Sequence, residues 1–165
     1  MMAFFEDIEI GEERRLGEHA FTREAIIAFA REYDPQRFHI DEEAAKDSIF
    51  EGLCASGWHV AAAAMRCIVE ARARGFAELK ARGEALPPLG VSPGVENLRW
   101  PTPTRPGDVV TYYNRVLAKR ETKRPQWGLM FLRTWGVNQH GREAIVMDNR
   151  AFIGRRDPGG APLSS

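Results

Sequence analysis

The spacing of apolar and polar residues divides the chain into a helical first half and a strand-rich second half. Residues 4–16 alternate weakly, which predicts a short strand with a turn at Gly11, and apolar residues then recur every three or four positions. From Val95 onward they recur every second position, the period of a β-strand. The pattern therefore predicts an α+β protein.

Two short helices are predicted from their capping residues. Thr22 is a suitable N-cap for a helix over residues 23–33, and Pro35 ends that helix because a residue before proline disfavours the helical conformation. Asp41 is a suitable N-cap for the next helix, whose first turn is acidic and so complements the helix dipole.

A long helix is predicted from Ser56 to at least Arg74. Its apolar stripe consists of Trp58, Ala61, Ala62, Met65, Ile68 and Val69. Residues 61–64 are all alanine, which favours a helix and lets another backbone approach closely. Gly75 weakens the pattern, so residues 76–82 are interpreted as a separate short helix that packs over a pocket opening.

The second half of the chain predicts strands at residues 95–100, 109–118, 127–137 and 143–154. One face of the third strand carries Trp127, Leu129, Phe131, Arg133, Trp135 and Val137. Short turns between consecutive strands give an antiparallel sheet. Such strands span about 35 Å and a twenty-residue helix about 30 Å, so the sheet can wrap around the long helix. One sheet face and its edge strands remain uncovered, which indicates a dimer.

Composition bounds the class of protein. The chain has 165 residues, 44% apolar and 28% charged, as in a soluble globular domain. We expect one domain over residues 1–156 and a disordered tail over residues 157–165, which include Pro, Gly and Ser. Lys plus Arg and Asp plus Glu both number 23, so the net charge of zero gives no electrostatic case for binding nucleic acid or an anionic membrane.

The cysteines and the N-terminal residues predict a cytoplasmic protein. Cys54 and Cys67 fall in or beside the apolar pattern of the long helix and are interpreted as buried thiols in a reducing compartment. The N-terminal residues lack the basic and apolar regions of a signal peptide, and no apolar run approaches the ~18 residues of a membrane span. No spacing of His and Cys indicates a metal site, and no cofactor is expected.

Residues 34–41 (DPQRFHID) place a carboxylate and an imidazole five residues apart. A helix cannot hold Asp34 and His39 on one face, whereas a turn led by Pro35 can bring them together. Spacing alone still favours structural roles, in which Asp34 ends a helix and His39 fills a gap. Gly57 lies at the start of the long helix, where backbone N–H groups are unpaired and the dipole favours negative charge.

Together with residues 52–59 (GLCASGWH), this stretch resembles the MaoC-like dehydratases, a group that includes the R-specific enoyl-CoA hydratases. Residues 105–108 (RPGD) resemble that family's later proline–glycine turn. The resemblance implies a hot-dog fold, a homodimer, and hydration or dehydration of enoyl-CoA and 3-hydroxyacyl-CoA thioesters, as in fatty acid metabolism, without a metal. It also implies that Asp34 and His39 are catalytic and that the Gly57 N–H is the oxyanion donor.

The chemistry gives these groups distinct tasks. Hydration of a double bond conjugated to a thioester needs a base for water, a proton donor for the α-carbon and a hydrogen-bond donor for the enolate oxygen. In the interpretation that we favour, Asp34 holds and deprotonates water and His39 delivers the proton to carbon; the reverse division stays open.

Ser56 and Trp58 flank Gly57 and are the candidate substrate-binding residues. Their simpler roles are helix capping for Ser56 and core or dimer-interface packing for Trp58. Two other functions are considered. A thioesterase on the same fold would need an acidic residue or a nucleophile on the long helix, whose first three turns offer no acid; the third possibility is a non-catalytic acyl-CoA-binding module.

Overall fold

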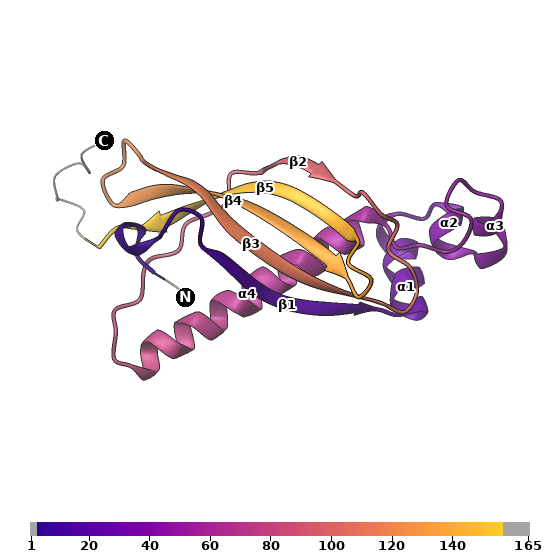
Figure 1. Ribbon diagram of the computed structural model, residues 1–165, viewed down its shortest axis with the longest axis horizontal. Coiled ribbons are helices and arrows are strands. Elements are labelled where there is room, and N and C mark those ends of the chain that lie inside the picture. Colours follow the sequence, from indigo (N-terminus) through magenta and orange to yellow (C-terminus); the bar gives the residue numbers. More distant parts are fainter. Residues whose placement is uncertain (1–2, 157–165) are drawn as a thin grey trace.

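One antiparallel sheet curves along one long helix in the computed structural model, which describes residues 3–156 (Figure 1). The helices are η1 (Phe5–Asp7, a 3₁₀ turn), α1 (Arg23–Tyr33), α2 (Arg37–Ile40), α3 (Glu42–Lys46) and α4 (Gly57–Ala81). The strands are β1 (Glu13–Phe21), β2 (Val95–Arg99), β3 (Asp108–Glu121), β4 (Trp127–Asn138) and β5 (Glu143–Gly154). The tail expected over residues 157–165 lies outside the described residues.

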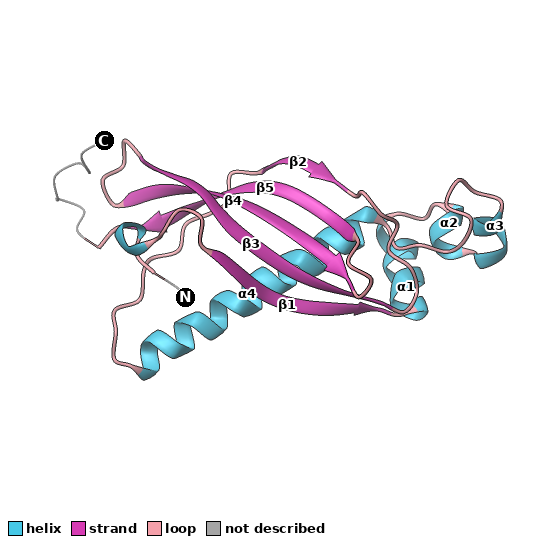
Figure 2. Ribbon diagram, viewed as in Figure 1, coloured by secondary structure: helices cyan, strands magenta, loops and turns pink. Residues whose placement is uncertain are grey.

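The sheet has the strand order β1-β3-β4-β5-β2, and every neighbouring pair is antiparallel. Helix α4 lies along one face of this sheet, and α1, α2 and α3 gather at the end where α4 begins (Figure 2). The predicted α+β arrangement of a sheet wrapped around a long helix, the hot-dog fold, is therefore confirmed. Among the described helices, none combines the length and apolar character needed to cross a membrane.

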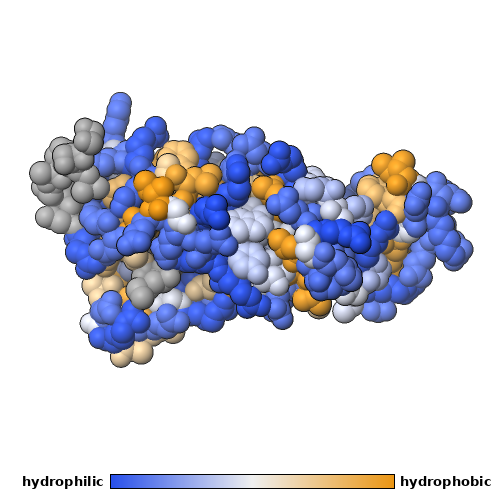
Figure 3. Space-filling view, in the orientation of Figure 1, coloured by the Kyte–Doolittle hydropathy of each residue, from blue (hydrophilic) through white to orange (hydrophobic). Residues whose placement is uncertain are grey.

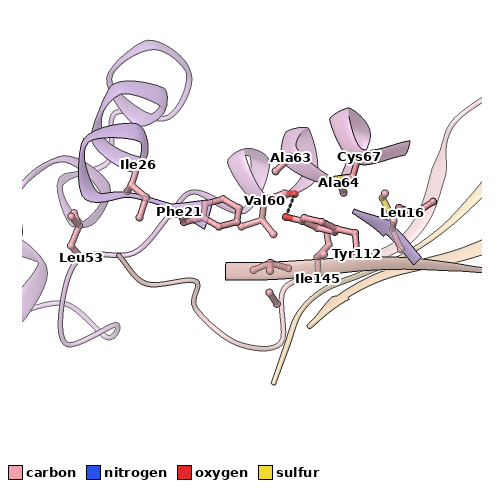
Figure 4. Packing of buried hydrophobic residues seen from close by; sticks show 14 of the residues in the cluster. Leu16, Phe21, Ile26, Leu53, Val60, Ala63, Ala64, Cys67, Tyr112 and Ile145 are labelled. Atoms are coloured by element: carbon pink, nitrogen blue, oxygen red, sulfur yellow. Dashed lines mark hydrogen bonds between the residues drawn. The ribbon is translucent and has the colours of Figure 1, made fainter. Parts of the chain in front are cut away.

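The core lies between α4 and the sheet (Figure 4). Phe21 and Ile145 are fully buried there, and burying side chains of this size stabilises a fold by about 1.5–3 kcal/mol each. The small side chains of Ala63 and Ala64 let the helix lie close to the strands. The buried Tyr112 hydroxyl donates a hydrogen bond of 3.1 Å to the Val60 carbonyl, so its polar end is satisfied within the apolar layer.

Only part of the predicted apolar stripe of α4 reaches the core, since Ala61 and Ile68 pack against it. Trp58, Met65 and Val69 are 58%, 47% and 52% exposed, whereas the buried positions of the helix are His59, Val60, Ala63, Ala64, Cys67, Gly75 and Leu79. Apolar residues occupy most of the circumference of this helix, so their spacing in the sequence does not indicate which face is buried. The sheet packs on the side with the smaller residues, because close approach needs them.

The inner face of β4 likewise carries smaller side chains than the predicted apolar face. Leu132, Thr134 and Gly136 are buried, whereas Trp135 is only partly buried and stacks on Tyr113 with 5.6 Å between ring centroids. A Cβ at Gly136 would lie 2.7 Å from Val110, so only glycine allows the neighbouring strand this close. Figure 3 shows hydrophilic surface over most of the face seen in Figure 1, with hydrophobic residues in separate patches.

Two further boundaries differ from the prediction. Residues 76–82 do not form a separate helix, since α4 runs through Gly75 to Ala81; one glycine in a helix costs only about 1 kcal/mol relative to alanine, and its neighbours favour helix. The first strand begins at Glu13 rather than near residue 4, because η1 instead inserts Phe5 against Gly128 of β4.

Candidate active site

The turn between α1 and α2 brings a carboxylate and an imidazole together. Asp34 ends α1, and its backbone N–H donates to the Ala30 carbonyl over 2.9 Å. Pro35 and the extended Gln36 then reverse the chain, and the single turn of α2 carries His39 back toward Asp34. As a result, Oδ2 of Asp34 lies 3.5 Å from Nε2 of His39.

The other ring nitrogen of His39 is held by a backbone carbonyl. Nδ1 lies 2.7 Å from the Cys54 carbonyl oxygen, and the His39 residue is only 5% exposed. A carbonyl oxygen can only accept a hydrogen bond, so Nδ1 must carry a proton. Nε2 is therefore the nitrogen that can gain or lose a proton, and it is the one that faces Asp34.

Both oxygens of the Asp34 carboxylate accept hydrogen bonds. The Ser56 hydroxyl donates to Oδ2 over 2.7 Å, and the Gln36 amide donates to Oδ1 over 2.8 Å. Burial acts to raise the pKa of Asp34, but the hydrogen bonds from Ser56 and Gln36, together with the charge of His39, outweigh burial and lower that pKa. Asp34 is therefore an ionised carboxylate at neutral pH.

Ser56 connects this carboxylate to the start of α4. Its oxygen accepts a hydrogen bond of 3.2 Å from the Trp58 backbone N–H, so Ser56 caps the helix as well as donating to Asp34. Gly57 is the first residue of α4, where N–H groups lack acceptors within the helix. A Cβ on Gly57 would lie 2.5 Å from the ring of Trp100, so this position has no room for a side chain.

A cavity of about 240 Å³ lies beside Gly57. Its walls include Phe50, Cys54, Val60, Trp100 and Thr104. A larger cavity of about 530 Å³ lies against Phe4, Leu79 and Pro87, near the other end of α4, and contains none of the predicted site residues. Asp34 and His39 are not among the lining residues of the smaller cavity, but Cys54, whose carbonyl bonds His39, is one of them, so this cavity is the nearer of the two to the pair.

The structure does not place every predicted residue at this centre. Trp58 packs edge-on against Trp100, with 5.4 Å between ring centroids, and does not line the cavity beside Gly57. Conversely, the sequence did not reveal the contacts of Gln36, the Cys54 carbonyl or Arg105. Within residues 3–156, no group of three or more His, Cys, Asp or Glu side chains is arranged to hold a metal ion.

Comparisons with known proteins identify the family. The family described as "MaoC like domain" matches residues 7–128. Protein MaoC of Klebsiella aerogenes is 30% identical over 124 residues, which are 74% of this chain; the chain spans only 32% of the length of that relative.

Solved structures agree with this family. The crystal structure of the MaoC-like dehydratase from Rhodospirillum rubrum is 38% identical, with a TM-score of 0.78 over 94% of this chain and 99% of that one. An R-hydratase of Pseudomonas aeruginosa shares the fold at 19% identity, with a TM-score of 0.61 over 98% of this chain and 95% of that one. The chain therefore belongs to the MaoC-like dehydratase family.

Proposed function

We propose that this protein is a hydratase/dehydratase that adds water to enoyl-CoA thioesters and removes it from 3-hydroxyacyl-CoA thioesters. One observation carries the proposal. The Nδ1 proton of His39 is fixed on the Cys54 carbonyl, so Nε2 faces the ionised Asp34 at 3.5 Å, and Asp34 is linked through Ser56 to the start of α4. This arrangement supplies a base, a proton donor and an anion-stabilising helix start within one small region.

In the hydration direction, water bound between Asp34 and Nε2 of His39 attacks the β-carbon and gives a proton to Asp34. The enolate oxygen that forms accepts a hydrogen bond from the Gly57 N–H, where the dipole of α4 favours negative charge. In the reacting state Nε2 of His39 carries a second ring proton, beside the one on Nδ1, and it delivers this proton to the α-carbon. The proton on Asp34 returns to Nε2, which restores both groups, and the net change is the addition of one water.

The environment of Asp34 favours this division of roles over the reverse. Its pKa lies below the ordinary value despite burial, because the carboxylate accepts hydrogen bonds from Ser56 and Gln36. Such a carboxylate is rarely protonated at neutral pH and is a poor source of a proton for carbon. His39 has a proton-exchanging nitrogen in reach of the same water and is the better donor.

The test is a panel of enoyl-CoA thioesters of increasing chain length. We expect the absorbance of the conjugated thioester to fall with time, and the 3-hydroxyacyl-CoA product to regenerate it in the reverse direction. A thiol-trapping reagent run in parallel should detect no free coenzyme A. Release of free thiol would instead indicate a thioesterase, and binding of the whole panel by the folded protein without turnover would indicate a binding module.

We also infer that the protein is a homodimer. Trp58, Met65 and Val69 expose apolar side chains on one face of α4, and β2 is an edge strand of the sheet that the described residues form. Val69→Arg should therefore lower the mass measured by sedimentation from that of a dimer to that of a monomer. The control is Ile10→Arg, since Ile10 is 62% exposed in the turn before β1 and should not affect the mass. An unchanged mass for Val69→Arg would contradict this interface.

A further inference from the structure

Arg105 lies in the turn that precedes β3, and its guanidinium donates hydrogen bonds to backbone carbonyls instead of to a carboxylate. Nη1 of Arg105 donates to the Gly52 carbonyl over 2.7 Å and to the Leu53 carbonyl over 3.3 Å, and Nη2 donates to the Phe50 carbonyl. Among the residues that the structure describes, no Asp or Glu side chain forms an ion pair with Arg105. All three acceptors of the guanidinium lie in one loop, residues 50–53.

The loop that Arg105 holds has an unusual backbone. Glu51 has a φ of 54° and Gly52 a φ of 149°, both in the region that side chains other than glycine rarely adopt. Residues 50–53 form neither helix nor strand, so their carbonyls are not paired within a regular element. The guanidinium supplies partners for three of these carbonyls at once.

The same loop carries the carbonyl that fixes His39. Cys54 follows Leu53 directly, and its carbonyl oxygen lies 2.7 Å from Nδ1 of His39. A second hydrogen bond joins the same two segments, since the Ala55 N–H donates to the Thr104 carbonyl over 2.8 Å. Arg105 is itself anchored, because its backbone N–H donates to Asp108 over 2.8 Å. The turn before β3 therefore holds the residues on both sides of Cys54.

We propose that Arg105 is a positioning residue for the Asp34–His39 pair. By holding residues 50–53, it keeps the Cys54 carbonyl against Nδ1, which keeps the proton on Nδ1 and leaves Nε2 toward Asp34. A planar guanidinium can bond three carbonyls through two nitrogens, whereas the single ammonium of lysine cannot reproduce that fork. The effect on turnover rests on the proposed function; the effect on the state of His39 does not.

The test compares Arg105→Ala with Lys119→Ala. Lys119 makes an equivalent contact near the other end of β3, where its Nζ donates to the carbonyls of Phe5, Glu6 and Ile8 over 3.1, 3.0 and 2.8 Å. Both changes remove a cation from three carbonyls, so both should lower the melting temperature. Only Arg105→Ala should lower kcat, by about 100-fold as expected for a misplaced catalytic group, with little change in KM.

Two readouts separate positioning from general stability. Guanidinium ion added at millimolar concentration should restore part of the lost kcat of Arg105→Ala, and it should not affect Lys119→Ala. In ¹⁵N spectra recorded at a pH high enough for the ring to be neutral, His39 should change from a ring protonated at Nδ1 to a mixture of tautomers in Arg105→Ala, and Arg105→Lys should fall between that variant and the wild type.

Unchanged ¹⁵N shifts of His39 in Arg105→Ala would overturn the inference, whatever happens to activity. A loss of kcat that guanidinium does not restore, with the His39 tautomer intact, would likewise show that Arg105 only stabilises the fold. If the wild type hydrates no enoyl-CoA but His39 still changes tautomer in Arg105→Ala, the positioning role stands and the proposed reaction fails.

Discussion

His39 and His59 are both buried near the start of α4, but their ring nitrogens have opposite surroundings. His39 places Nδ1 on a carbonyl and Nε2 beside a carboxylate. The ring of His59 stacks on Phe29 with 4.5 Å between centroids, meets Phe21 at 5.0 Å and lies 5.9 Å from the ring of His19. Within the described part of the chain, Nδ1 of His59 has no hydrogen-bond partner.

These surroundings give the two sites different capacities for proton transfer. Burial, and then the neighbouring His19, lower the pKa of His59 to about 4, so its ring is neutral at neutral pH. Burial and the charge of Arg66 also lower the pKa of His19, against the opposing effect of Glu70. A buried histidine thus becomes a candidate for catalysis through its polar partners. The aromatic cluster around His59 instead uses the ring as a packing group.

Asp34→Asn should produce the largest contrast between the two sites. It retains the shape of the side chain but removes the charge that faces Nε2 and the oxygen base that takes a proton from water. We expect kcat for enoyl-CoA hydration to fall by roughly 10²–10⁴-fold, the usual contribution of general acid–base groups. The melting temperature should change little by comparison. Retention of more than a tenth of the wild-type rate would exclude Asp34 as the base.

Ser56→Ala should have an intermediate effect. It removes a donor to Asp34 and the cap of α4, so it should lower stability by about 1 kcal/mol. Loss of that donor raises the pKa of Asp34, so the acidic limb of the kcat/KM profile should move to higher pH. Thr22→Ala is the matched control, because Thr22 caps α1 through the Ala25 N–H; it should lose similar stability without moving the profile. Identical profiles for both variants would contradict the link from Ser56 to Asp34.

His59→Phe should have the smallest effect on activity and should change the response to acid. The unfolded chain takes up a proton on His59 below about pH 6.5, whereas the folded chain resists protonation down to about pH 4. The protein therefore loses stability as pH falls through this window, by up to about 3 kcal/mol from this one group. His59→Phe should flatten the fall in urea midpoint between pH 6.5 and 4. The same slope in both proteins would show that His59 is protonated in the fold.

Much of the fold could be predicted because its signals are local. Thr22, Pro35 and Asp41 fix the ends of α1 and α3 through their own backbone and side-chain chemistry, and the structure confirms these caps. The buried face of α4 could not be predicted, because apolar residues surround the helix and only the sheet selects a side. His19 illustrates the same limit, since it lies within β1, beyond the residues 4–16 that the sequence predicts as a strand.

The candidate site, like the fold, could be predicted only in part from the sequence. The approach of Asp34 and His39 was anticipated from the turn at Pro35, which lies between them in sequence. The Cys54 carbonyl and Arg105 were not identified, because a backbone carbonyl has no signature in a sequence and Arg105 reaches residues 50–53 only through the tertiary fold. The His19–His59 cluster also joins β1 to α4 and follows from packing alone.

The most direct test of the account compares His39→Ala and His59→Phe on one enoyl-CoA thioester at neutral pH. Initial rates of hydration should fall by at least about 100-fold for His39→Ala and stay within about twofold of wild type for His59→Phe. Circular dichroism and melting curves would establish that both variants are folded. Equal losses in the two variants, or a greater loss in His59→Phe, would contradict the claim that polar partners make His39 the working histidine.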